Sequence, residues 1–216
     1  MLEKMSDFFE NRLAGYDQHM MTNIESATEF YPFTARMLPT DEKSRILDLG
    51  CGTGLELEEY FLLCPSAKVT GIDLSKGMLS ALEKKFTDQD ITLIFGSYFD
   101  IPFDENTFDA AVSVESLHHF TKKEKIPLYR KLLAALKDGG YFILTDYFAF
   151  SDEEEQMHRK NLIALKEEQG IADDAFYHYD TPLTVKHETE ALLEAGFSSV
   201  TVLNHWGATY TVKAVK

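Results

Sequence analysis

A glycine-rich turn between an apolar run and an amphipathic segment is the feature that most constrains the fold of this chain. Residues 46–49 form the apolar run, Gly50, Gly52 and Gly54 follow it, and apolar side chains at helical spacing occupy residues 55–63. Because glycine has no Cβ, such a turn lets the backbone approach a ligand closely. The pattern predicts a buried strand, a ligand-binding loop and a helix N-terminus, which together are typical of a nucleotide site.

The spacing of the glycines distinguishes two kinds of nucleotide. A dinucleotide site requires glycines at relative positions one, three and six, but Leu55 stands at the sixth position. From Asp48 onward the residues instead follow the pattern Asp-x-Gly-x-Gly-x-Gly, which resembles motif I of the class I S-adenosylmethionine-dependent methyltransferases. The resemblance implies that the glycine backbone passes beneath the methionine part of the cofactor and that Asp48 helps to hold its amino group. An ordinary glycine turn is the alternative.

A second acidic residue stands where the next strand is expected to end. Residues 68–72 are rich in β-forming side chains, Asp73 follows them, and Ser75 can cap a helix. A carboxylate at the end of the second strand of a βαβ unit can accept hydrogen bonds from both ribose hydroxyls. NAD enzymes place an acid similarly, so Asp73 supports the cofactor assignment only in combination with the glycine loop.

A third segment also resembles these methyltransferases. Residues 96–103 are similar to a stretch of the family whose Asp contacts the adenine amino group, but Ser97 stands at that position. A serine hydroxyl can accept one hydrogen bond without supplying a charge. Met78 and Tyr98 could flank the adenine ring, and the alternative is that both are core residues. The cofactor-binding residues implied by the resemblance are Tyr16, Asp48, Gly50, Cys51, Gly52, Gly54, Asp73, Leu74, Met78, Ser97, Tyr98, Phe99, Val114, Glu115 and His119.

A histidine pair follows the fourth expected strand, at residues 108–114. The family commonly has histidine at this place, and ligands bind beyond the carboxyl ends of the strands in open α/β sheets. The pair is therefore expected near the reacting groups, although a purely structural role is the alternative. A general base matters only if the acceptor is protonated at the working pH, and the candidates in order are His119, His118, Tyr177 and His178. No spacing of metal ligands is apparent, so no metal is expected.

The order of the expected elements predicts an α/β fold with a doubly wound, mostly parallel seven-stranded sheet of the Rossmann-like methyltransferase type. A fifth strand is expected at residues 141–145. The apolar runs 199–203 and 209–215, with a short turn near Gly207, predict a closing antiparallel hairpin. Residues 1–216 are expected to form a single domain.

Two segments lie outside this shared core. Residues 1–40 are expected to form a helical arm, with a helix beginning near Pro32, and related enzymes use such an arm to cover the cofactor. Residues 148–182 form an insertion that is expected to act as a helical lid. Its aromatic cluster at residues 176–179 resembles the lining of a lid, and core packing of those rings is the alternative.

Charge and composition limit the partners of the chain. Its 216 residues carry a formal net charge of -15 without any basic run, so neither nucleic acid nor a membrane is expected as a partner. No stretch is long enough to cross a membrane, the N-terminus lacks the pattern of a signal peptide, and the two cysteines suggest no disulfide framework. These features favour the cytoplasm and leave the oligomeric state open.

These interpretations together predict an enzyme that uses S-adenosyl-L-methionine to methylate a small molecule. The insertion and the C-terminal part, however, also resemble the carboxy-S-adenosylmethionine synthases, which transfer a carboxyl group from prephenate onto the same cofactor. A non-catalytic module that binds the cofactor is a third alternative. The sequence identifies neither the acceptor nor the acceptor atom.

Overall fold

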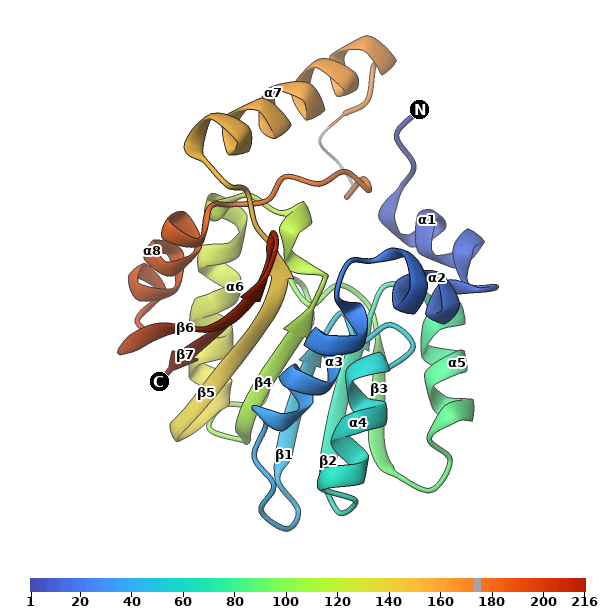
Figure 1. Cartoon of the computed structure of the whole chain (residues 1–216), viewed down its shortest axis with the longest axis vertical. Helices are drawn as coiled ribbons and strands as arrows, with labels where there is room; N and C mark the ends of the chain where they lie inside the picture. The colour runs from blue at the N-terminus through green and yellow to red at the C-terminus, as the bar shows by residue number, and fades with distance from the viewer. Residues whose placement is uncertain (173–175) are drawn as a thin grey trace.

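The computed structural model of the protein describes residues 1–172 and 176–216 and is built around one seven-stranded sheet (Figure 1). The strand order is β3-β2-β1-β4-β5-β7-β6. Strands β1 to β5 run parallel to one another, whereas β7 is antiparallel to both β5 and β6. The strands are β1 (Arg45–Leu49), β2 (Lys68–Asp73), β3 (Asp90–Phe95), β4 (Phe108–Val114), β5 (Leu136–Tyr147), β6 (Ser199–Trp206) and β7 (Thr209–Val215).

Helices cover both faces of the sheet through two apolar clusters. One cluster includes Phe30, Leu57 and Leu82, which bring α3, α4 and α5 onto one face. The other includes Leu132 and Leu192 of α6 and α8 on the opposite face. The helices are α1 (Met5–Arg12), α2 (Tyr16–Asn23), α3 (Ala27–Arg36), α4 (Leu55–Leu63), α5 (Lys76–Lys85), the short 3₁₀ helix η1 (Leu117–His119), α6 (Lys122–Ala135), α7 (Asp152–Gln169) and α8 (Val185–Ala195).

This architecture confirms the predicted fold, including the closing hairpin, whose turn contains Gly207. Two predicted boundaries were wrong. The helix expected near Pro32 begins at Ala27, because burial of Phe30 on the sheet stabilises the turn before the proline despite its missing N–H. The fifth strand begins at Leu136, which pairs with Phe108 ahead of a register shift.

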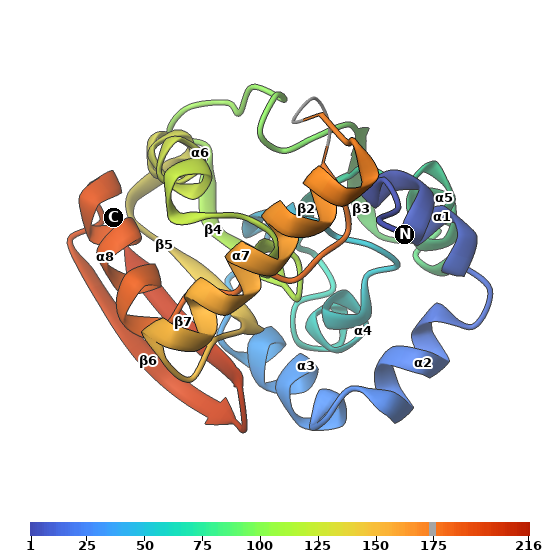
Figure 2. The same ribbon diagram turned by 90° about the horizontal axis from the view of Figure 1, so that it is seen from above.

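The segments outside the core gather above the carboxyl ends of the parallel strands. Viewed from above, α7 crosses over the sheet and the arm formed by α1 and α2 curves around the side of α4 and α5 (Figure 2). The arm and the stretch after α7 are joined by backbone hydrogen bonds, from Met5 N to the Phe176 carbonyl at 2.9 Å and from His178 N to the Glu3 carbonyl at 3.0 Å. None of the helices formed by the described residues is long and apolar enough to cross a bilayer.

Candidate active site

The turn between β1 and α4 has one position that is open to a ligand. Gly50, Gly52 and Gly54 all have positive φ angles, of 74°, 48° and 74°, which other residues rarely adopt. A Cβ on Gly50 would lie 2.2 Å from the Ser116 Oγ, and one on Gly54 would lie 2.9 Å from the Phe86 ring, so internal packing accounts for those two glycines. A Cβ on Gly52 would meet no protein atom within 4 Å. The backbone at Gly52 is therefore the part of the turn that a ligand can approach.

Below this turn lies a buried carboxyl group that faces another acid instead of a donor. Asp48 is fully buried near the end of β1, no N–H or hydroxyl group of the described residues donates to its carboxyl oxygens, and its carboxyl group adjoins that of Glu56. One carboxyl oxygen of the buried Glu56 also lacks such a donor. Burial, and then the negative charge of Glu56, raise the pKa of Asp48 well above its usual range. A buried polar group without a partner costs free energy, so a ligand amino group would stabilise this pair of acids.

The second acidic residue connects the glycine turn to β2. One carboxylate oxygen of Asp73 accepts a hydrogen bond from Gly52 N at 2.9 Å, and the other accepts one from Ser75 N at 2.8 Å. Burial raises the pKa of Asp73, while these backbone N–H groups act in the opposite direction. Each carboxylate oxygen can accept a further hydrogen bond. Asp73 thus stands beside the open side of the turn, where the sequence predicts a ribose contact.

The side chains expected around adenine are largely buried or hydrogen-bonded within the protein. Met78 and Tyr98 are only 1% and 6% exposed, and the Tyr98 hydroxyl lies 3.1 Å from the Ser116 Oγ. The Ser97 hydroxyl accepts a hydrogen bond from Phe99 N at 3.1 Å. Core packing accounts for the two buried side chains, and their contact with adenine stays a prediction. Of the other residues in the predicted cofactor-binding set, Cys51 and Val114 are buried and Leu74 is partly buried against the core.

The N-terminal arm covers the glycine turn. The Thr53 hydroxyl donates to the Asp17 carboxylate at 2.5 Å, and the Lys85 ammonium lies 2.8 Å from the other oxygen of Asp17. Tyr16 is the first residue of α2, and its pKa is raised by burial and then by the negative charge of Asp73. These contacts place the start of α2 against the turn, the position that the sequence predicts for a covering arm.

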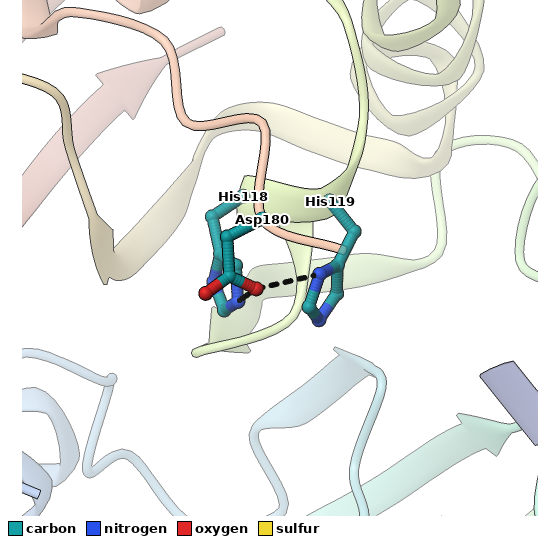
Figure 3. A group of neighbouring side chains, drawn as sticks. All are labelled: His118, His119 and Asp180. Carbon is teal, nitrogen blue, oxygen red and sulfur yellow. Dashed lines mark ion pairs between the residues drawn. The ribbon is translucent and has the colours of Figure 1, made fainter. Parts of the chain in front are cut away.

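The histidine pair meets two acidic residues that the sequence analysis did not single out. His118 Nδ1 lies 2.5 Å from an oxygen of Asp146 in β5. In Figure 3, the carboxylate of Asp180 lies between the two imidazoles, 3.5 Å from His118 Nε2 and 3.2 Å from His119 Nδ1. The position of Asp146 at the end of an expected strand could have indicated it. For Asp180, the only sequence signal of a place in the site was its position directly after the aromatic run 176–179.

The charges of this group are strongly coupled. Burial opposes protonation of His118, but the carboxylates of Asp146 and Asp180 raise its pKa well above the usual range. Burial, and then the charge of His118, lower the pKa of His119. Burial, and then the charge of Asp146, raise the pKa of Glu115 to about 8. Glu115 also has a φ of 49°, a backbone conformation that is strained for a residue other than glycine.

A cavity of about 820 Å³ lies between the arm, the histidine pair and the C-terminal hairpin. Glu115, both histidines of the pair and Asp180 line it, together with Tyr16 and His178, which stacks on Phe8 at 3.4 Å between ring centroids. Burial lowers the pKa of His178 to about 4. Three of the four predicted catalytic residues therefore share one cavity. The fourth, Tyr177, lines a separate cavity of about 1170 Å³.

The fold and the glycine turn with Asp48 and Asp73 define the class of S-adenosylmethionine-dependent methyltransferases. Residues 46–140 match the profile of a methyltransferase domain. Residues 46–140 are thus similar to the methyltransferase domains of this class, whose cofactor is S-adenosyl-L-methionine. This outcome confirms the family that the sequence motifs indicate.

Three known proteins illustrate the similarity. Cypemycin N-terminal methyltransferase of Streptomyces sp. is 33% identical over 132 residues, which cover 54% of this chain and 52% of that protein. Carboxy-S-adenosyl-L-methionine synthase of Nitratiruptor sp. is 23% identical over 226 residues, which cover 100% of this chain and 95% of that protein. A structure of a putative O-methyltransferase from Nostoc punctiforme has a TM-score of 0.73 at 20% identity and covers 99% of this chain and 62% of that one. Several curated relatives are matched over only 30% to 52% of their length.

Proposed function

We propose that the protein transfers a methyl group from S-adenosyl-L-methionine to a small-molecule acceptor. The observation that carries the proposal is the buried Asp48 carboxyl group, which has no donor among the described residues and lies below a turn whose Gly52 faces open space and bonds to Asp73. The amino group of the cofactor suits the first site and its ribose hydroxyls suit the second. When bound, this cofactor supplies a methyl group that its sulfonium already makes electrophilic.

The protein then has to position the acceptor, exclude water and, where necessary, remove a proton. The arm closes over the glycine turn through Asp17 and Thr53, and Tyr16 lines the cavity that also contains the histidine pair. We propose this cavity as the acceptor site. His119 and His118 are the proposed groups for proton removal, followed by Tyr177 and His178.

A carboxyl transfer of the kind made by carboxy-S-adenosylmethionine synthases is the second candidate. It is favoured by the relative from Nitratiruptor sp., of which this chain covers 95%. A donor such as prephenate carries two carboxylates and requires positive side chains for binding. Among the described residues that line the acceptor cavity, Arg12 is the only Lys or Arg, while Glu25, Glu115 and Asp180 are acidic. The described lining of this cavity therefore lacks the cluster of Lys and Arg side chains that such a donor would need, which supports methyl transfer.

The decisive experiment compares the two possible products. We would incubate the purified chain with S-adenosyl-L-methionine and prephenate, and separately with methyl-labelled cofactor and a panel of metabolites. Mass spectrometry should detect S-adenosylhomocysteine and a labelled acceptor, and no carboxylated cofactor. Formation of the carboxylated cofactor would overturn the proposed reaction. Cofactor binding by calorimetry without turnover of any acceptor would favour a non-catalytic module.

We also propose that the chain works in a reducing compartment such as the cytoplasm. Cys51 and Cys64 are free and buried, which supports this setting.

A further inference from the structure

His118, His119 and Asp180 form a group that methyl transfer needs only where the acceptor has to lose a proton. One ring nitrogen from each histidine and one oxygen of Asp180 all lie within 4.8 Å of one another (Figure 3). Two side chains come from η1 and the third from the segment after α7. All three line the 820 Å³ cavity, and the Asp180 side chain is 45% exposed. The group is therefore both preassembled and accessible to a small molecule.

The distances within the group match the ligand set of a transition-metal ion. Bond lengths of about 2.0 to 2.2 Å from a tetrahedral ion to its nitrogen and oxygen ligands place those ligands about 3.3 to 3.6 Å apart. The distances from the Asp180 oxygen are 3.5 Å to His118 Nε2 and 3.2 Å to His119 Nδ1. Both distances lie close to the tetrahedral range, and the ring nitrogens of the two histidines, within 4.8 Å of each other, would complete the set around an ion.

A further carboxylate fixes the orientation of the first histidine. The Asp146 carboxylate lies 2.5 Å from His118 Nδ1. It also accepts hydrogen bonds from Leu117 N at 2.8 Å and from Tyr147 N at 2.9 Å. With its proton on Nδ1, His118 presents the lone pair of Nε2 toward Asp180. Metal-binding histidines usually donate their other ring nitrogen to a carboxylate in this way, which fixes the tautomer and raises the basicity of the ligand.

The second histidine requires a change of tautomer. His119 Nδ1 lies 3.3 Å from the Tyr179 carbonyl, to which it can donate a hydrogen bond when no ion is present. A neutral imidazole with its proton on Nε2 instead offers the Nδ1 lone pair to an ion. Metal binding therefore replaces this hydrogen bond by a coordinate bond.

We propose that His118 Nε2, His119 Nδ1 and Asp180 form a binding site for a divalent transition-metal ion of the zinc type. Two imidazoles and one carboxylate favour such an ion over magnesium or calcium, which prefer oxygen ligands. Three protein ligands leave a coordination position directed at the cavity, as in catalytic rather than structural zinc sites. The site reverses the expectation of no metal, because that expectation relied on spacing in the sequence and Asp180 is distant from the histidine pair.

The proposed site has a clear use if the chain is the methyltransferase proposed above. An ion at this place would lower the pKa of an acceptor hydroxyl or thiol that reaches the cavity, so that its oxygen or sulfur would be a better nucleophile for the methyl group. Only this use depends on the proposed function, because metal binding itself can be measured without it.

The test measures metal binding directly. The purified chain is treated with a chelator, dialysed, and titrated with Zn²⁺ by calorimetry and with Co²⁺ by visible absorption. We expect one equivalent of either ion and a Co²⁺ spectrum of the intense, tetrahedral type. Asp180→Asn and His119→Gln should each lower Zn²⁺ affinity on the order of 100-fold or more, and Asp146→Asn by about 10-fold to 100-fold.

His158→Gln is the matched control, because His158 lies on α7 and lines neither of the two cavities. It should bind one equivalent of Zn²⁺ with unchanged affinity. Circular dichroism establishes that each variant is folded. Asp180→Asn and His119→Gln each remove a different ligand, so the site can be tested with either variant if the other does not fold. The absence of one tight equivalent, or equal affinity in Asp180→Asn, His119→Gln and His158→Gln, would overturn the site. Calorimetry with S-adenosyl-L-methionine on the same samples tests the proposed function separately.

Discussion

A buried ion pair between α6 and α8 allows a quantitative prediction about stability. The Lys125 ammonium lies 2.5 Å from one oxygen of Glu188, and each residue is only 1% exposed. The Tyr129 hydroxyl donates a hydrogen bond to the other oxygen of Glu188. Burial raises the pKa of Asp146, while the charges of His118 and then of Lys125 lower it below its usual range.

We predict that Lys125→Met lowers the free energy of unfolding by about 3 kcal/mol. Removing one partner of a buried ion pair typically costs about 3 to 5 kcal/mol, because the remaining charge is left without compensation. Tyr129 still donates to Glu188, and a hydrogen bond to a charged group is worth about 1.5 to 3 kcal/mol, which favours the lower end of that range. Adding Glu188→Gln removes the uncompensated charge while keeping an acceptor for Tyr129. The double variant should therefore recover at least about 1 kcal/mol relative to Lys125→Met.

Urea unfolding at pH 7, monitored by circular dichroism, measures these differences in the free energy of unfolding. The slope of that free energy against urea concentration should be the same for all variants. Lys122→Met serves as the control, since its ion pair with Glu190 joins side chains that are 30% and 45% exposed. Exposed pairs contribute about 0 to 1 kcal/mol. The reasoning fails if Lys125→Met costs no more than Lys122→Met, or if the double variant is less stable than Lys125→Met alone.

Two further predictions concern the cofactor site. Asp73→Ala should weaken binding of S-adenosyl-L-methionine and S-adenosylhomocysteine by about 1.5 to 3 kcal/mol, the scale of lost hydrogen bonds to a charged group, and calorimetry showing unchanged affinity or tight NAD binding would contradict the assignment. Gly50→Ala should lower the melting temperature more than Gly52→Ala, because both alanines would have a strained positive φ but only the Cβ at Gly50 would lie 2.2 Å from the Ser116 Oγ; Gly52→Ala should chiefly weaken binding of the cofactor. Equal melting temperatures for the two glycine variants would refute that distinction.

The parts of the site that depend on local sequence were predictable. The alternating glycines after Asp48 and the acid at the end of residues 68–72 specify a turn and a strand end within a few residues, and the structure places Asp73 against Gly52 N as a consequence. The mostly parallel sheet followed from the alternation of strands and helices, because neighbouring parallel strands need a crossover connection, usually a helix. The closing hairpin had its own turn signal at Gly207.

The contacts between distant segments were not predictable in the same way. Asp180 reaches the histidine pair only because the chain returns over the sheet after α7, and no local pattern specifies that path. The aromatic run was predicted as a lid lining, yet its first residue, Phe176, packs 5.3 Å from Phe99 and 5.1 Å from Phe120 between ring centroids. Of its other members, His178 lines the cavity at the histidine pair, Tyr177 lines the other cavity, and Tyr179 lines neither.

The N-terminal arm and the insertion after β5 are joined by backbone hydrogen bonds, and the arm also contacts the cofactor side of the site. The arm holds the cofactor side through Glu10, whose carboxylate accepts hydrogen bonds from the Ser75 hydroxyl at 2.7 Å and from Gly77 N at 3.0 Å. The start of the same arm is bonded to the backbone at 176–178, two residues before Asp180. Because these two backbone hydrogen bonds join the arm to residues 176–178, a displacement of the arm that leaves them intact is expected to shift Asp180 as well. The cofactor side of the site and the group of His118, His119 and Asp180 therefore share one structural support.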